Sequence, residues 1–348
     1  MRIALDAMGG DFAPAAIVQG GLEAARLMEG ECEVVFVGDE LKIAEEIARH
    51  PLLTRGEKQY YSIHHASEKI EMADKPTEAL KKKKDASILV ANQLQRDRKV
   101  DAVVSAGHTG AAMAASLFVL GRIPGVNRPG IGSLIPNGYG VTMLIDVGAN
   151  VDAKAVHLLQ YGLMGSIFME RVVGMQKPKI ALLSIGEERS KGTEVTREAY
   201  EMLERSNINF IGNVEGRDIL QAKADVVVCD GFVGNVILKY TESLGNVFRR
   251  HIKRQIGKKI FLNIGAFLMQ PTFKGLRKIF DYEEYGGAPL LGVDGVTIIC
   301  HGSSTPKAIR NAVKEAVAMV REGINQIIRR ELEAFEVQKG VSLVEQDA

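Results

Sequence analysis

The sequence predicts an α/β protein with an open, mostly parallel sheet that is covered by helices on both faces. Two observations lead to this fold class. Short apolar runs alternate with longer helical patterns along nearly the whole chain, and most of these runs end in small or polar loops that usually contain glycine. In this architecture ligands bind at the carboxyl ends of the strands, so these loops are the first place to look for a functional site.

Each expected strand is a short run rich in apolar and β-branched residues, as in the I-A-L-D of residues 3–6. In chain order, strands are expected at residues 3–6, 33–37, 60–64, 102–105, 141–146, 179–184, 209–211, 226–229 and 296–300. Each expected helix repeats its apolar residues at intervals of three and four, or is a longer apolar run. In chain order, helices are expected at residues 13–28, 41–49, 77–96, 111–120, 154–172, 193–205 and 306–333.

Length and composition indicate a globular protein with a large core. The chain has 348 residues, of which 46% are hydrophobic, and no long linker interrupts it. Length alone suggests one large domain or two lobes. We expect a single α/β domain over residues 1–335 with a protruding helical tip at about 243–282, and a flexible tail over 336–348.

Charge, cysteine usage and hydropathy indicate which partners and which cellular location the protein has. A net charge of +1 gives no global field that would favour nucleic acid, and we expect no nucleic-acid partner. The three cysteines form no C-x-x-C pair, so buried reduced thiols in a cytosolic protein are expected, with a catalytic thiol as the alternative. A strand at the very start leaves no room for a signal peptide, and no apolar run is long enough to span a bilayer. We expect a cytoplasmic protein, or one attached only to a membrane surface.

Polar loops follow seven of the expected strands. They are residues 7–11, 106–110, 147–150, 185–188, 212–216, 230–235 and 301–304. If all seven lie at one edge of the sheet, they form one polar cleft lined by backbone groups.

The loop from Ser105 to Gly110 has the pattern of an anion site. It joins an expected strand to an expected helix, and Gly107 and Gly110 let backbone N–H groups approach an oxyanion. Thr109 adds a hydroxyl, and the helix N-terminus adds partial positive charge. The alternative is that the glycines only make a tight turn.

Several familiar sites are missing from the sequence. It contains no P-loop, no dinucleotide fingerprint, no H-E-x-x-H, no G-x-S-x-G and no evident metal-ligand spacing, so we expect no nucleotide site of these types and a mechanism without a metal. The loops instead offer backbone amides, asparagines, serines and histidines, with Lys154, Lys239 and the lysine run 81–84 nearby. Such groups suit the positioning of an oxyanion better than nucleophilic catalysis by a side chain. Inorganic phosphate, which needs no enzyme nucleophile to attack an activated carbonyl, fits this preference.

The segment 243–280 combines basic and apolar residues and contains no acidic residue. Four apolar residues of its helical pattern share one face: Ile260, Ile264, Phe267 and Leu268. This combination suits the surface of an anionic membrane or an acidic protein partner. A helical hairpin packed at a dimer interface is the alternative, and the two are compatible.

Seven motifs, taken together, closely resemble the bacterial phosphate acyltransferase family of phospholipid synthesis. They are D-A-M-G-G-D (6–11), S-A-G-H-T-G-A (105–111), D-V-G-A-N-V-D (146–152), G-N-V-E-G-R-D (212–218), D-G-F-V-G-N (230–235), Y-G-G-A-P-L-L-G (285–292) and H-G-S-S (301–304). The resemblance implies transfer of a long-chain acyl group from acyl carrier protein to inorganic phosphate, which supplies acyl phosphate to a downstream glycerol-3-phosphate acyltransferase. It also implies a homodimer without cofactor, and a fold similar to isocitrate and isopropylmalate dehydrogenases and to phosphate acetyltransferases. Contact with anionic lipids at the inner face of the cell membrane is implied for a tip at about 257–280.

The resemblance also suggests roles for individual residues. Asp230 to Lys239 is similar to a D-x-x-x-G-N-x-x-x-K stretch of phosphate acetyltransferases, which points to Asn235 and Lys239 as active-site residues. The working assignment gives Gly107, Thr109 and Gly110 to phosphate, Asn150 and Asn235 to the acyl oxyanion, and His301 or His108 to proton transfer. His108 stands where asparagine is expected in the family. The remaining expected substrate-binding residues are Asp6, Gly9, Gly10, Ser105, Lys154, Asn213, Asp230, Ser303 and Ser304.

Two other functions stay open at this point. One is a phosphate acetyl- or butyryltransferase that uses acyl-coenzyme A, and the other is a non-catalytic scaffold at the membrane surface.

Overall fold

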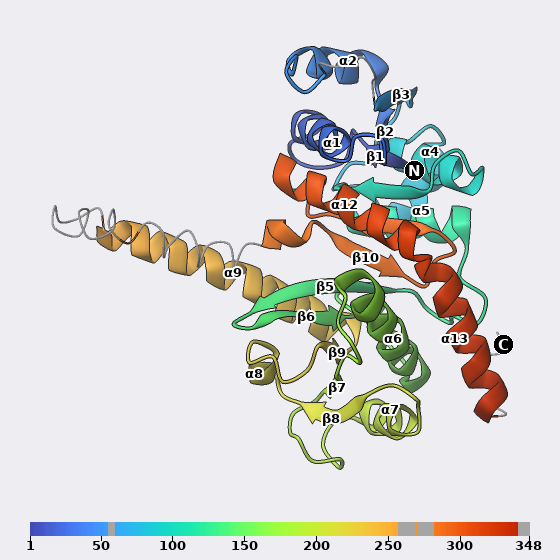
Figure 1. Cartoon of the computed structure of the whole chain (residues 1–348), viewed down its shortest axis with the longest axis vertical. Coiled ribbons are helices and arrows are strands. Elements are labelled where there is room, and N and C mark those ends of the chain that lie inside the picture. The colour runs from blue at the N-terminus through green and yellow to red at the C-terminus, as the bar shows by residue number, and fades with distance from the viewer. Residues whose placement is uncertain (55–59, 257–268, 270–281, 340–348) are drawn as a thin grey trace.

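The fold is organised around one sheet of eleven strands, which we describe from a computed structural model (Figure 1). The structure describes residues 1–54, 60–256, 269 and 282–339. The strand order is β3-β2-β1-β4-β11-β10-β5-β6-β9-β7-β8. The strands are β1 (Arg2–Asp6), β2 (Glu33–Gly38), β3 (Tyr61–His65), β4 (Ala102–Ser105), β5 (Gly130–Asn137), β6 (Gly140–Ile145), β7 (Ile180–Leu183), β8 (Phe210–Val214), β9 (Val226–Val228), β10 (Ala288–Leu291) and β11 (Val296–Ile299).

Side chains on the two faces of this sheet form two separate cores. In β1, Ile3 and Leu5 belong to one core and Ala4 to the other, as the alternation of side chains along a strand requires. The first core is covered by α1 (Ala15–Leu27), α2 (Glu40–Ala48), α6 (Ala155–Phe168), α7 (Glu194–Glu204), α12 (Pro306–Glu322) and α13 (Ile324–Lys339). The second is covered by α3 (Pro76–Lys82), α4 (Ser87–Arg96), α5 (Thr109–Leu120), α8 (Gly216–Ile219) and the start of α9 (Gly231–Ile256). The predicted α/β fold with helices on both faces is confirmed.

Every expected strand has a counterpart, but two strands in the middle of the sheet were missed. β5 contains two glycines and a proline, and β10 is only four residues long and contains a proline. Neither has the composition of a typical strand. β10 pairs antiparallel with β11 and with β5, and β5 pairs antiparallel with β6. The other pairings are parallel.

These three antiparallel pairings correct the expectation of a single polar edge. Three reversals between β11 and β6 make β6, β9, β7 and β8 run opposite to β1, β4 and β11. The loops after β1, β4 and β11 therefore leave one edge of the sheet, and the loops after β6, β7, β8 and β9 leave the other. The seven polar loops form two groups.

Two expected helices are each divided in two. The pattern over 77–96 breaks between α3 and α4, where Lys83 ends α3 as its C-cap residue and its Nζ donates to Asp74. The pattern over 306–333 breaks at Gly323, which adopts a left-handed conformation with φ of 62°. α13 continues to Lys339, so helix extends into the expected tail, and residues 340–348 lie outside the described residues.

α9 extends away from the sheet in Figure 1. The predicted tip residues Ile260, Ile264, Phe267 and Leu268 lie outside the described residues. Among the helices that the structure describes, none is both long and apolar enough to cross a membrane.

Candidate functional site

The first loop group is organised around the buried carboxylate of Asp6. Asp6 and Ser105 end the neighbouring parallel strands β1 and β4 and are paired in register. Ser105 Oγ donates to Asp6 Oδ2 at 2.7 Å, and Ser87 Oγ donates to Asp6 Oδ1 at 2.6 Å. Burial raises the pKa of Asp6, and the hydrogen bonds from the two serines act in the opposite direction.

Two of the loop's backbone N–H groups are already bound by side chains of the same loop. The N–H of Gly107 donates to Ser105 Oγ at 3.1 Å, and the N–H of Gly110 donates to His108 Nδ1 at 3.1 Å. His108 is therefore the N-cap of α5, and because Nδ1 accepts, the neutral ring carries its proton on Nε2. An anion that used the N–H of Gly110 would have to replace His108 there. Thr109 is exposed at the first position of the helix.

Close backbone contacts join the loops after β1, β4 and β11. A Cβ on Gly9 would lie 2.6 Å from Asp6 Oδ2 and 2.8 Å from the nitrogen of Gly107. Gly10 has φ of +111°, and a Cβ there would lie 3.1 Å from the carbonyl oxygen of Gly302. These two positions therefore require glycine. The structure brings the predicted residues of loops 6–11, 105–110 and 301–304 together.

The H-G-S-S loop holds a histidine and a serine in direct contact. His301 Nδ1 accepts from the backbone N–H of Ser303 at 3.2 Å and lies 2.8 Å from Ser303 Oγ. The neutral His301 ring therefore carries its proton on Nε2. Ser304 is buried, and its hydroxyl has no hydrogen-bond partner within the part of the chain that the structure describes.

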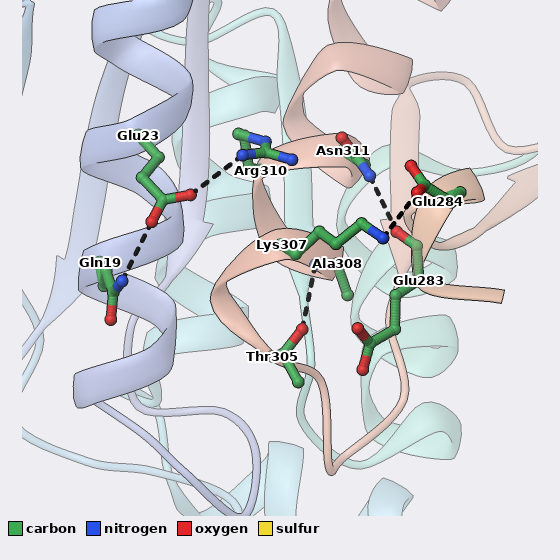
Figure 2. Close-up of polar contacts among 9 residues, drawn as sticks. All are labelled: Gln19, Glu23, Glu283, Glu284, Thr305, Lys307, Ala308, Arg310 and Asn311. Carbon is green, nitrogen blue, oxygen red and sulfur yellow. Dashed lines mark hydrogen bonds and ion pairs between the residues drawn. The ribbon is translucent and has the colours of Figure 1, made fainter. Parts of the chain in front are cut away.

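The H-G-S-S loop leads directly into α12, which is fixed on two sides (Figure 2). Arg310 forms an ion pair with Glu23 of α1 at 3.3 Å. On the other side, Lys307 pairs with Glu284 at 2.7 Å, and Asn311 Nδ2 donates to the carbonyl oxygen of Glu283 at 2.9 Å. The Glu residues 283 and 284 belong to the short 3₁₀ helix η2 (Tyr282–Tyr285). These contacts hold the helix start, and with it the loop, in a fixed position.

A small pocket opens within the first loop group. Its lining includes Asp6, Lys69, Ser87, Ser105, Gly107 and His108. Sequence reasoning missed Lys69 and Ser87. Ser87 gave a weak signal, as a small polar residue at the start of the apolar run S-I-L-V-A, whereas Lys69 lies in a loop without any pattern.

The second loop group is organised around Asp146, which is fully buried. Asp146 Oδ1 accepts from the backbone N–H groups of Ile131 at 3.0 Å, Gly148 at 3.0 Å and Ala149 at 2.9 Å. Its Oδ2 accepts from the N–H of Asn150 at 2.7 Å. Burial raises the pKa of Asp146, and these N–H groups oppose that shift. The amides of this loop therefore bind a carboxylate of the protein.

The predicted oxyanion residue Asn150 is part of the same network. Its Nδ2 donates to the carbonyl oxygen of Pro129 at 2.6 Å and to the hydroxyl of Tyr161 at 2.7 Å. Both amide hydrogens thus have partners within the protein. A contact of Asn150 with substrate stays a prediction.

The start of α9 packs against this loop and brings Asn235 to it. Asp230 Oδ1 accepts from the N–H of Val233 at 2.9 Å and so caps the helix. Asn235 is exposed, and a Cβ on Gly148 would lie 3.9 Å from its Cβ. Lys239 lies one turn later on the same face and pairs with Glu242 at 3.0 Å.

Two further predicted residues lie around this group. Asn213 lies within β8, not in the loop after it, and its Nδ2 donates to the carbonyl oxygen of Glu188 at 3.0 Å. Lys154 is exposed at the N-cap of α6.

All three cysteines are free and buried. Burial raises the pKa of Cys32 to about 11 and raises the pKa values of Cys229 and Cys300 as well. A reactive thiolate is disfavoured at each position. In the described residues, no cluster of three or more His, Cys, Asp or Glu side chains is placed to hold a metal ion.

Comparison with known proteins decides the family. The sequence profile of a family described as "Fatty acid synthesis protein" matches residues 1–327. The phosphate acyltransferase of Pelotomaculum thermopropionicum is 48% identical over 347 residues, which cover 99% of each chain. The chain belongs to the phosphate acyltransferase family. The phosphate acyltransferase of Heliobacterium modesticaldum is 50% identical over 329 residues, 94% of this chain and 95% of that protein. As a member of the phosphate acyltransferase family, the chain is an enzyme of acyl transfer to phosphate.

Solved structures with the same fold include a phosphotransacetylase from Streptococcus pyogenes. It superimposes with a TM-score of 0.63 at 17% identity and covers 92% of this chain and 94% of that one. A branched-chain phosphotransacylase from Enterococcus faecalis superimposes with a TM-score of 0.53 at 12% identity and covers 91% of this chain and 99% of that one. The fold predicted from the resemblance is therefore confirmed.

Proposed function

We propose that this enzyme transfers a long-chain fatty acyl group from acyl carrier protein to inorganic phosphate. A phosphate oxygen attacks the thioester carbonyl carbon, the new C–O bond forms, and the C–S bond breaks. The proton of HPO₄²⁻ ends on the departing thiolate, so the products are acyl phosphate and the free carrier thiol. The acyl phosphate is the substrate of a downstream glycerol-3-phosphate acyltransferase.

The observation that carries this proposal is the junction of three polar loops at the start of α5, beside Lys69. A helix N-terminus and a nearby cation attract an anion of the size of phosphate. We assign Gly107, Thr109 and Gly110 to phosphate, with the bound phosphate taking over the Gly110 N–H from His108.

Direct attack by phosphate is favoured over an acyl-cysteine intermediate because each cysteine is buried with a raised pKa. His301 and His108 remain our candidates for proton transfer, since each neutral ring presents its N–H at Nε2. Neither residue is placed by these contacts on a substrate.

Asn235 is our first candidate for the acyl oxygen, because its side chain is exposed beside loop 147–150. Asn150 supports that loop, and Lys239 adds positive charge on the same helix face as Asn235. A sheet twists by roughly 20–25° per strand, so over the four steps from β4 to β6 the two strand directions differ by roughly a right angle. For Asn235 to bind the acyl oxygen, both loop groups must converge on one thioester carbonyl, because the attacking phosphate oxygen and the acyl oxygen share the same carbon.

A basic surface at α3 supports a protein donor with an acidic surface. Lys69 pairs with Glu71, Lys75 with Glu78, and Lys83 with Asp74. Lys81, Lys82 and Lys84 are exposed, and no ion pair of theirs is found among the described residues. Pro76, at the start of α3, would lie 3.1 Å from a Cβ on Gly110, so this surface borders the proposed phosphate site.

The donor is tested by comparing kcat/KM for palmitoyl-acyl carrier protein and for palmitoyl- and acetyl-coenzyme A. We expect the carrier-protein thioester to be preferred. Lys81→Gln/Lys82→Gln/Lys84→Gln should lower kcat/KM for this donor by about tenfold and weaken its salt dependence. Lys177→Gln/Lys179→Gln/Lys314→Gln, at exposed lysines on other surfaces, is the matched control. A preference for coenzyme A thioesters would support the acetyl- or butyryltransferase alternative, and no turnover of any thioester would support the scaffold.

Dimer formation and peripheral attachment to the inner face of the cell membrane are further parts of the proposal. Phe232, Val236, Tyr240 and Val247 are exposed apolar residues spaced along α9, which supports contact with a second copy of the chain. Flotation with anionic liposomes should be lost in Phe267→Glu/Leu268→Glu. Unchanged flotation would assign these residues to dimer packing or donor docking.

A further inference from the structure

Ser87 makes a contact that its position in the sequence does not suggest. It is the first residue of α4 and lies 81 positions from Asp6, yet its hydroxyl donates to Asp6 Oδ1 at 2.6 Å. The hydroxyl does not cap the helix, since the N-cap residue of α4 is Ala86 and its cap has no side-chain hydrogen bond. The backbone N–H of Ser87 donates to the carbonyl oxygen of Glu68 at 2.9 Å. Ser87 is 2% exposed, so this hydrogen bond is shielded from water.

A chain of hydrogen bonds connects Ser87 to the proposed phosphate loop, residues 105–110. Asp6 is 3% exposed and accepts from Ser87 on one oxygen and from Ser105 on the other. Because Ser105 donates its only proton to Asp6, its oxygen is free to accept from the N–H of Gly107 at 3.1 Å. This last bond fixes the orientation of the peptide between Ala106 and Gly107, one residue before His108.

Burial makes each step of this chain depend on the others. A buried carboxylate needs hydrogen-bond donors, and bonds to a charged group are the stronger ones. Without Ser87, Asp6 Oδ1 keeps the backbone N–H of Met8 at 3.3 Å, which is a long contact. The carboxylate would then shift or take up a proton, and Ser105 would lose the orientation in which it holds Gly107.

We propose that Ser87 is a positioning residue for phosphate, which it orients through Asp6, Ser105 and Gly107 without touching it. This inference rests on the proposed function, because it takes the pocket at Gly107 and His108 as the phosphate site. It assigns to Ser87 a role in phosphate affinity and no role toward the acyl donor.

The test compares two buried serines on neighbouring helices, one hydrogen-bonded to Asp6 and one not. Ser87→Ala should raise KM for phosphate, and the dissociation constant of inorganic phosphate in calorimetry, by about tenfold or more, with KM for the acyl donor within twofold of wild type. Ser116→Ala is the matched control. Ser116 is fully buried on α5, and its hydroxyl donates to Asn92 Oδ1 of α4 at 3.0 Å, away from Asp6. This variant should lower the melting temperature similarly and leave KM for phosphate unchanged.

A double variant tests the route through Asp6. If Ser87 and Ser105 act through the same carboxylate, Ser87→Ala/Ser105→Ala should raise KM for phosphate little more than the more damaging single variant. The proposal is overturned if Ser87→Ala leaves KM for phosphate unchanged or raises KM for phosphate and for the acyl donor equally. It is also overturned if the increase in KM for phosphate in the double variant equals the product of the two single increases. Wild-type enzyme that neither binds phosphate nor forms acyl phosphate would instead contradict the proposed function, so the two failures are distinguishable.

Discussion

Asn150 donates a hydrogen bond from its side-chain nitrogen to the hydroxyl of Tyr161 at 2.7 Å. The same nitrogen lies 3.3 Å from Asp146 Oδ2, so the Asn150 amide dipole stabilises the buried carboxylate weakly while it fixes the loop. Burial also raises the pKa of Tyr161, which keeps its hydroxyl neutral.

Replacement of Asn150 by aspartate should therefore be more damaging than replacement by alanine. Asn150→Asp places a second carboxylate beside Asp146, and we expect a loss of about 2–4 kcal/mol in the free energy of unfolding, against about 1–2 kcal/mol for Asn150→Ala. Urea denaturation at pH 7.5 and pH 5.5 measures both. The excess loss should shrink at the lower pH, where one carboxyl takes up a proton. Equal losses for the two variants would contradict this network.

The contact of α9 with loop 146–150 leaves no room for a side chain at Gly234. A Cβ there would overlap the carbonyl oxygen of Asp146, so Gly234→Ala should cost about 2 kcal/mol and displace Asn235, with loss of activity. Gly216→Ala is the control, because nothing lies within 4 Å of its Cβ position, and it should be neutral or stabilising by about 0.4–1 kcal/mol. Denaturation and kcat measure both effects. A stable and active Gly234→Ala enzyme would show that this packing is wrong.

The Ser303 hydroxyl and His301 Nδ1 are close enough to form a nucleophile and base pair, at 2.8 Å. If phosphate attacks the thioester directly, Ser303→Ala should retain activity within about tenfold of wild type. Without phosphate, the wild-type enzyme should release no burst of carrier thiol. A loss of about 10³-fold or more, together with such a burst, would reveal an acyl-serine intermediate.

Glu315 on α12 has a carboxyl oxygen, Oε1, that is buried without a hydrogen-bond partner among the described residues. Burial raises the pKa of Glu315 from its ordinary 4.5 to about 8, while the N–H of Gly287, 3.5 Å from Oε2, opposes this weakly. The folded protein therefore keeps a proton that the unfolded chain loses, so this group reduces stability as pH rises from about 4.5 to about 8.

Glu315→Gln should consequently be more stable than wild type at pH 8.5, by about 1 kcal/mol or more, and the difference should vanish near pH 4.5. Glu322→Gln, at an exposed position of the same helix, should show no such pH dependence. Guanidinium denaturation across this pH range measures the difference. A constant difference at all pH values would contradict a buried, protonated Glu315.

The periodicity of the sequence predicted the fold class and most helices and strands, because the spacing of apolar residues follows the buried face of each element. It did not predict β5 and β10, since the two glycines and the proline of β5, and the proline in the four-residue β10, are typical of turns and loops. Without them the reversal of direction between β11 and β6 could not be foreseen, and all polar loops were placed at one edge.

The candidate site was predictable as a set of loops but not as a set of contacts. Glycine-rich strand ends identified loops 6–11, 105–110 and 301–304. Their hydrogen-bond partners come from remote parts of the chain, as Ser87 does for Asp6 and Tyr161 for Asn150. A residue such as Asn150, whose type suits an oxyanion, proves to have partners within the protein that spacing alone does not reveal.

Acyl transfer to phosphate is measured by incubating purified enzyme with palmitoyl-acyl carrier protein, with and without inorganic phosphate, and quantifying both products. We predict that palmitoyl phosphate and free carrier thiol form in equal amounts and only when phosphate is present. Release of thiol without phosphate, or no acyl phosphate at saturating phosphate, would contradict it.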